Sequence, residues 1–110
     1  MNRFVEIPEQ GVLCDLLWSD PTDDTADNWA ANKNRSCSYF YSRVQASRFL
    51  NSNQLRMIIR GHEVQMKGYK YQMGPGNQPL TLTIFSAPRY CDSYRNKGAV
   101  AVLNVTDFSI

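Results

Sequence analysis

Apolar residues follow a helical spacing in two stretches of the chain. The first helical face is formed by Val12, Leu13, Leu16 and Leu17. This spacing predicts a short helix, which ends near Trp18 because Pro21 cannot continue a regular helix. A second helix is predicted over residues 42–53, "SRVQASRFLNSN", where apolar residues are again helically spaced and turn residues follow.

Other stretches are rich in β-branched and aromatic residues and are bounded by turn residues, which predicts strands. The segment 80–88, "LTLTIFSAP", gives the strongest strand signal and is stopped by Pro88, while "GPGNQP" at 74–79 predicts a turn. A last strand is expected to begin at "FSI", residues 108–110. The further predicted strands are 37–42, 55–61, 67–73 and 98–105.

A long polar segment, "DPTDDTADNWAANKNRS", separates the first helix from the first predicted strand. It is longer than most connections in a compact domain, which indicates function or mobility. Several strands with two helices predict an α+β domain over residues 1–110, with its strands packed as part of a sheet sandwich.

The net charge of +2 hides an asymmetry, because residues 1–27 carry −6 and residues 28–110 carry +8. The basic residues are scattered singly, which favours a solvated face with a few functional arginines over nucleic-acid binding. No apolar run approaches the roughly 18 residues of a membrane span, so no membrane partner is expected. Three widely spaced cysteines predict reduced thiols and a cytoplasmic or nuclear location.

Three residues suggest phosphate chemistry. His62, the only histidine, follows a predicted buried strand, Tyr90 follows another, and Arg35 ends the polar segment with a guanidinium that can fork onto a phosphate. The set is incomplete, because a dinuclear metal site needs several more ligands and no phosphate-binding glycine loop is present. Pairing of Cys91 with His62 as a thiolate nucleophile is an open alternative without support in the spacing.

Four stretches of the chain together resemble the phosphoprotein phosphatase family of Ser/Thr protein phosphatases. They are "LLWSDP", "RSCSYFYS", "FLNSNQLRMIIRGHEVQMKGYKY" and "LTIFSAPRYCDSYRNKGAVAVL". They occur in the family's order across nearly all of residues 11–103, and "CSYFYS" and "YRNKGAVAVL" look most like the calcineurin catalytic subunit.

The resemblance implies a metallophosphoesterase-type β-sandwich flanked by helices, with two metal ions (Fe, Zn or Mn) at one edge. It implies that His62 is a metal ligand, that Arg35 holds the substrate phosphate, that Tyr90 lines the same site, and that Asp20 borders the substrate groove. Three of these roles have a structural alternative: a surface or hydrogen-bonded core residue for His62, a loop salt bridge for Arg35 and packing for Tyr90. Arg89 stands where the family usually has asparagine, so it adds a cation near the phosphate site or points to solvent.

The family's GDxHG, GDxVDRG and GNHE motifs, which carry the remaining metal ligands, are absent from the chain. The resemblance therefore covers the C-terminal segment of a catalytic domain. We expect a Ser/Thr protein phosphatase segment that is inactive alone, whose parent domain hydrolyses phosphoprotein substrates and binds a regulatory subunit. The alternatives are a non-catalytic docking or regulatory module derived from a phosphatase, and a fragment with no function of its own.

Overall fold

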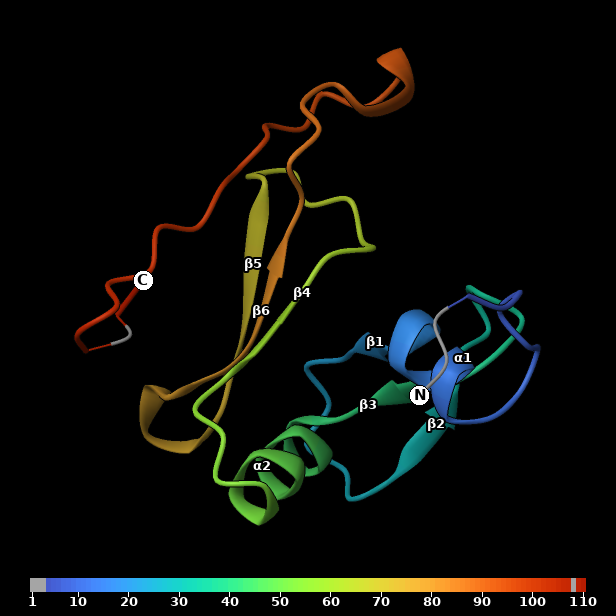
Figure 1. Ribbon diagram of the computed structural model, residues 1–110, viewed down its shortest axis with the longest axis vertical. Coiled ribbons are helices and arrows are strands. Elements are labelled where there is room, and N and C mark those ends of the chain that lie inside the picture. The colour runs from blue at the N-terminus through green and yellow to red at the C-terminus, as the bar shows by residue number, and fades with distance from the viewer. Residues whose placement is uncertain (1–3, 108) are drawn as a thin grey trace. The chain divides into compact units, whose positions relative to one another are not determined.

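The computed structural model describes residues 4–107 and 109–110 (Figure 1). The chain divides into two compact units. Unit 1 holds the described residues up to Ile58 together with Gln72–Thr81. Unit 2 holds Ile59–Tyr71 and the described residues from Leu82 onward.

Unit 1 contains a three-stranded sheet in the order β1-β3-β2. Strand β3 (Tyr39–Tyr41) pairs in parallel with β1 (Asp20–Pro21) and antiparallel with β2 (Trp29–Ala31), as Figure 1 shows. Strand β3 confirms the strand predicted over residues 37–42. Strands β1 and β2 lie inside the stretch that the sequence predicted as a polar loop, so this loop is partly folded onto β3.

The two predicted helices are confirmed as α1 (Val12–Trp18) and α2 (Arg43–Ser52). Helix α2 begins after Ser42, whose hydroxyl accepts a hydrogen bond from Gln45 N at 3.4 Å and so satisfies one free amide of the first turn. The apolar face of α2 packs in the core of unit 1, which consists of Tyr41, Ala46, Leu50 and Leu80 with Ile58 against it.

A second sheet has the strand order β4-β6-β5, formed by β4 (Ile58–Arg60), β5 (Tyr69–Met73) and β6 (Pro79–Ile84). All three strands were predicted from the sequence. The predicted turn between β5 and β6 is a short 3₁₀ segment, η1 (Pro75–Asn77), closed by a 2.7 Å hydrogen bond from Gly74 N to Gln78 O. The loop after β6 contains a second such segment, η2 (Tyr90–Asp92).

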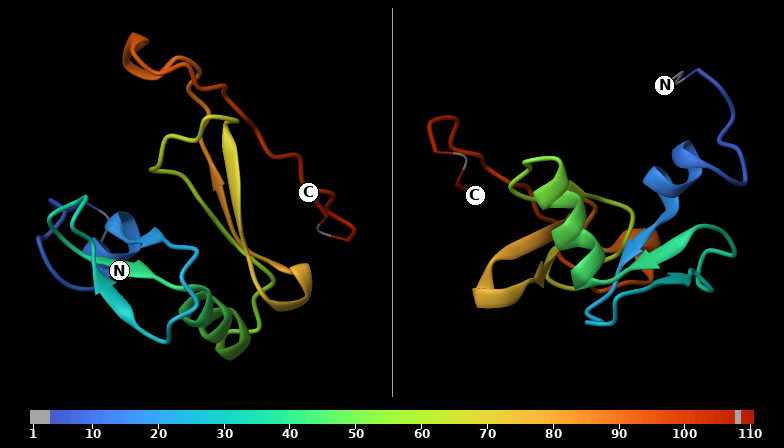
Figure 2. Two further views of the ribbon diagram at one scale, coloured as in Figure 1. Left: turned by 180° about the vertical axis from the view of Figure 1, so that it is seen from behind. Right: turned by 90° about the horizontal axis from the view of Figure 1, so that it is seen from below.

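The strand predicted over residues 98–105 is wrong: all eight residues are described, and they follow an irregular path (Figure 2). Ala99 N donates to Phe85 O at 3.0 Å, but no ladder continues from this bond. Val100, Val102 and Val105 are 79–84% exposed. A strand needs a neighbour that completes its hydrogen bonds, so β propensity alone does not form one here. Of "FSI", position 108 lies outside the described residues, and Ser109 and Ile110 form no strand.

Within the described residues, no helix combines the length and the apolar character that crossing a bilayer requires.

Candidate functional site

Arg35 lies in the loop that joins β2 to β3, and local hydrogen bonds shape this loop. Asn32 N donates to Ser38 O at 3.0 Å, and Arg35 N donates to Asn32 O at 3.2 Å. The side-chain oxygen of Asn32 accepts from Asn34 N at 3.1 Å, which makes a side-chain-closed turn. The loop therefore presents Arg35 from a defined backbone position rather than from a free segment.

A buried carboxylate orients the Arg35 guanidinium. Asp20, on β1, is 2% exposed, and its Oδ2 accepts from Arg35 Nε at 3.0 Å and from Asn32 Nδ2 at 2.9 Å. The Arg35 side chain remains 26% exposed. A charge-assisted bond at Nε restricts the orientation of the guanidinium, so the partly exposed side chain of Arg35 is held at a defined position beside Asp20.

The sequence predicted that Asp20 borders a substrate groove, and the structure places it in contact with Arg35 and Asn32. The alternative for Arg35, a loop salt bridge, describes a contact that does form. The contact is made by Nε, and the side chain of Arg35 keeps 26% of its surface exposed. Asn32 was not singled out from the sequence, since nothing in "AANKNR" separates it from its neighbouring asparagines.

Two further aspartates of the polar segment pair with arginines of α2. Arg43 Nη2 lies 3.4 Å from Asp23 Oδ1, and Arg48 makes two 2.6 Å hydrogen bonds to the carboxylate of Asp27. Together with the Asp20–Arg35 pair, these contacts match three of the seven acids before position 28 with basic residues after it. Within unit 1, acidic residues before position 28 neutralise basic residues after it.

His62 follows β4 in unit 2 at a positive φ of 81°. Non-glycine residues adopt this backbone conformation uncommonly. On either side of it, Arg60 Nη1 and Glu63 Oε2 form a 2.6 Å ion pair that braces the turn. The Nδ1 atom of His62 is buried and makes no hydrogen bond among the described residues, although the residue has an interaction partner in the structure.

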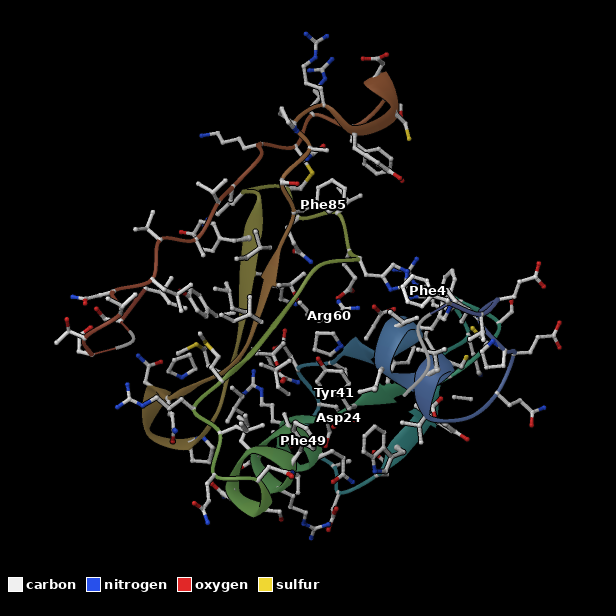
Figure 3. The ribbon with its side chains drawn as sticks, viewed as in Figure 1. Phe4, Asp24, Tyr41, Phe49, Arg60 and Phe85 are labelled. Atoms are coloured by element: carbon white, nitrogen blue, oxygen red, sulfur yellow. The ribbon has the colours of Figure 1, made fainter. Side chains whose placement is uncertain are left out.

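Tyr90 lies in the loop after β6, also in unit 2. Its ring meets Phe85, labelled in Figure 3 where β6 runs into this loop, edge-on at a centroid distance of 5.0 Å. Tyr90 is nevertheless 42% exposed. Packing thus positions one face of the ring while much of the side chain stays open to solvent, so the packing alternative explains only part of its placement.

The described residues do not build a complete metal site. No group of three or more histidine, cysteine, aspartate or glutamate side chains in this part of the chain is placed to hold a metal ion. An imidazole suits zinc, iron or manganese, so His62 has the chemistry of a nitrogen ligand for these metals.

The three cysteines are free thiols in different environments: Cys14 is buried, Cys37 is half-buried and Cys91 is exposed. Burial and the neighbouring Cys37 thiol raise the pKa of Cys14 above its usual value. A raised pKa lowers the thiolate fraction at neutral pH, so Cys14 has the character of a core residue.

The sequence profile of calcineurin-like phosphoesterases matches residues 1–66. The chain therefore belongs to the calcineurin-like phosphoesterase family. The catalytic subunit A1 of serine/threonine-protein phosphatase 2B from Saccharomyces cerevisiae is 39% identical over 129 aligned residues, which cover 98% of this chain. The serine/threonine-protein phosphatase 4 catalytic subunit of Kluyveromyces lactis is 36% identical over 97% of this chain.

A solved structure gives the same answer for the fold. A protein serine/threonine phosphatase from Saccharomyces cerevisiae, with similarity to human phosphatase PP5, superposes with a TM-score of 0.74 at 34% identity over 89% of this chain. The resemblance to Ser/Thr phosphatases and the metallophosphoesterase-type α+β fold are confirmed. The chain spans 23% of the phosphatase 2B subunit, 32% of the phosphatase 4 subunit and 28% of the solved structure.

Proposed function

We propose that this chain forms part of a Ser/Thr protein phosphatase that hydrolyses phosphomonoesters on phosphoproteins. The observation that carries the proposal is the Asp20–Arg35 contact, which fixes a partly exposed guanidinium on a loop inside the matched family region. Similarity to several Ser/Thr phosphatases over nearly the whole chain supports the same substrate class.

In this proposal Arg35 binds the phosphate and stabilises the negative charge that develops on its oxygens. Asp20 and Asn32 hold Arg35 in the binding orientation. Tyr90 lines the substrate site with its exposed face, and His62 supplies one ligand of the metal centre. Calcineurin-like phosphoesterases use divalent metal ions, which supply Lewis acidity toward phosphate and water when bound.

The remaining ligands are provided by the rest of a catalytic domain, so the experiment needs a complete one. Residues 11–103 of this chain replace the matching segment of the full-length phosphatase 2B subunit A1. Hydrolysis of a phosphoserine peptide by this hybrid subunit is then measured with Mn²⁺. Arg35→Ala is expected to leave metal content unchanged and to lower kcat/KM by about 10- to 150-fold, because a hydrogen bond to a charged group is worth roughly 1.5–3 kcal/mol.

His62→Ala is expected to lower metal content and turnover together, with partial recovery at higher Mn²⁺. Arg48→Ala is the matched control, because Arg48 pairs with Asp27 on the surface and has no proposed role in binding. Metal analysis beside steady-state kinetics separates the roles. Loss of metal in Arg35→Ala, or full metal content in His62→Ala, would refute the assignments. Mn²⁺-dependent turnover by the 110-residue chain alone would refute the dependence on further ligands.

A further inference from the structure

The loop that carries Tyr90 is closed by one buried asparagine. Asn96 is 2% exposed, and its Nδ2 donates to Ala87 O at 2.8 Å and to Lys97 O at 3.0 Å. Its Oδ1 accepts from Tyr90 N at 3.0 Å, and its backbone oxygen accepts from Arg89 N at 3.0 Å. Arg89 and Tyr90 are therefore anchored side by side through their backbone amides.

Arg89 occupies a backbone conformation that does not favour arginine. Its φ and ψ are 52° and 46°, the left-handed region, in which asparagine is several-fold enriched among non-glycine residues. The resemblance to Ser/Thr phosphatases implies asparagine at this position, so arginine stands in place of a residue better suited to the left-handed region. Unfavourable backbone conformations concentrate at functional sites, which directs attention to the guanidinium.

Some arginines of the chain form an ion pair with an acidic side chain, and others do not. Arg35, Arg43, Arg48 and Arg60 each pair with an aspartate or glutamate. Among the described residues no ion pair involves Arg89, which is exposed and directly precedes the half-exposed Tyr90. Arg95 and Lys97, also exposed, give this loop a net positive charge against the single acid Asp92.

We propose that Arg89 selects substrates that carry a carboxylate side chain within two residues of the phosphorylated residue. The inference rests on the proposed function, because Tyr90 marks the substrate site only in a phosphatase. A guanidinium forks onto a carboxylate with two parallel hydrogen bonds. Asparagine at the same position offers no charge to such a side chain.

The test compares two phosphoserine peptides of identical composition. In one, a glutamate lies next to the phosphoserine, and in the other the same glutamate lies eight residues away. Both are titrated into the isotopically labelled 110-residue chain, and the amide NMR signals of residues 86–97 are followed. The adjacent glutamate is expected to tighten binding by about two- to fivefold, as for a solvent-exposed charge pair. Raising the NaCl concentration is expected to shrink this difference, because salt screens exposed charges.

Arg89→Asn is expected to abolish the difference between the peptides, and Arg89→Lys to retain a smaller one. Arg95→Asn, which removes the same charge from the same loop, is the matched control and is expected to keep most of the difference. Equal binding of both peptides by the unaltered chain would overturn the proposal, as would an unchanged preference in Arg89→Asn.

The kcat/KM of both peptides is also measured with the phosphatase 2B subunit that carries residues 11–103 of this chain. This measurement separates the role of Arg89 from the proposed phosphatase function. Equal kcat/KM for both peptides refutes the role of Arg89 and leaves the phosphatase assignment intact. Absence of turnover with both peptides, beside an active unaltered subunit, refutes the phosphatase assignment. A twofold or larger kcat/KM preference that disappears in Arg89→Asn supports both.

Discussion

Unit 1 and unit 2 hold their loops by different means. In unit 1, aspartates of the polar segment contact arginines directly, as in the Asp20–Arg35 and Asp27–Arg48 pairs. In unit 2, the loop after β6 is held through backbone groups, by the Asn96 side chain and by the hydrogen bond from Ala99 N to Phe85 O. Aspartates therefore orient the arginines of unit 1, whereas no ion pair among the described residues involves Arg89, Arg95 or Lys97 in the loop of unit 2.

The largest effect should come from removing the buried acid of unit 1. Asp20→Ala removes the carboxylate that accepts from Arg35 Nε, and it leaves Asn32 Nδ2 with only its longer bond of 3.3 Å to Trp18 O. We expect a loss of about 3 kcal/mol in the free energy of unfolding, at the lower end for a broken buried pair because Arg35 is partly exposed. Urea denaturation followed by tryptophan fluorescence measures this, since Trp18 and Trp29 both belong to unit 1.

Asp23→Ala is the control for that loss. Its pair with Arg43 is longer, at 3.4 Å, and both side chains are at least 36% exposed. We expect a change of about 0–1 kcal/mol, typical of a surface ion pair. Equal destabilisation by the two substitutions would show that burial does not distinguish the pairs.

The next effect should come from adding a single methyl group in unit 2. Gly68 has a φ of +84°, and a Cβ there would lie 2.7 Å from Gly98 C and 2.8 Å from Ala99 N. Gly68→Ala combines overpacking with backbone strain, so we expect a loss of about 2–3 kcal/mol. Amide hydrogen exchange read by mass spectrometry over residues 82–107 should show reduced protection.

Gly61→Ala is the matched control within unit 2. A Cβ at Gly61 meets only Ile84 O, at an ordinary contact distance of 3.7 Å. Protection over residues 82–107 should therefore be nearly unchanged. If Gly68→Ala leaves the same protection, the close approach of Gly68 to Gly98 is not what holds this segment.

The smallest effect concerns thiol reactivity. At pH 7.5, alkylation should modify the exposed Cys91 first and the buried Cys14 last. A thiol reacts as the thiolate, which forms above its pKa, so a raised pKa delays the reaction of Cys14 to higher pH. Mass spectrometry of partially alkylated chains measures the order, and reaction of Cys14 before Cys91 would contradict it.

Local signals were sufficient for the helices and for the central strands. Helix α2 could be predicted because its apolar spacing lies in one segment and its N-terminal Ser42 is a favourable cap. Strand β2 was missed because three residues within a polar segment carry little pattern. It forms through its partner β3, with the rings of Trp29 and Tyr41 6.4 Å apart.

Candidate site residues could be singled out from the sequence only where a residue type is rare or a motif is distinctive. His62 is the only histidine, and Tyr90 is the last residue of the distinctive "SAPRY" stretch. The burial of Asp20 could not be predicted, because seven acids precede position 28 and only contacts made 12 and 15 residues away set this one apart. Residues 98–105 show the converse error, since a clear strand pattern does not reveal whether a partner strand exists.

The hydrogen bonds of the Asn96 side chain hold the loop after β6 independently of most of the loop's own side chains. Its bonds reach only backbone groups at residues 87, 90 and 97 and do not depend on the side chains of residues 91–95. At the end of this loop, the backbone of Gly98 lies so close to Ser86 that a Cβ at position 98 would lie 2.4 Å from Ser86 O. Libraries that randomise residues 91–95 and keep Asn96 and Gly98 constant would test whether the Asn96 bonds alone hold the loop in place. Positions 91 and 92 restrict this randomisation, because Cys91 and Asp92 have φ angles of 52° and 53°, which few residue types other than glycine, asparagine and aspartate adopt readily.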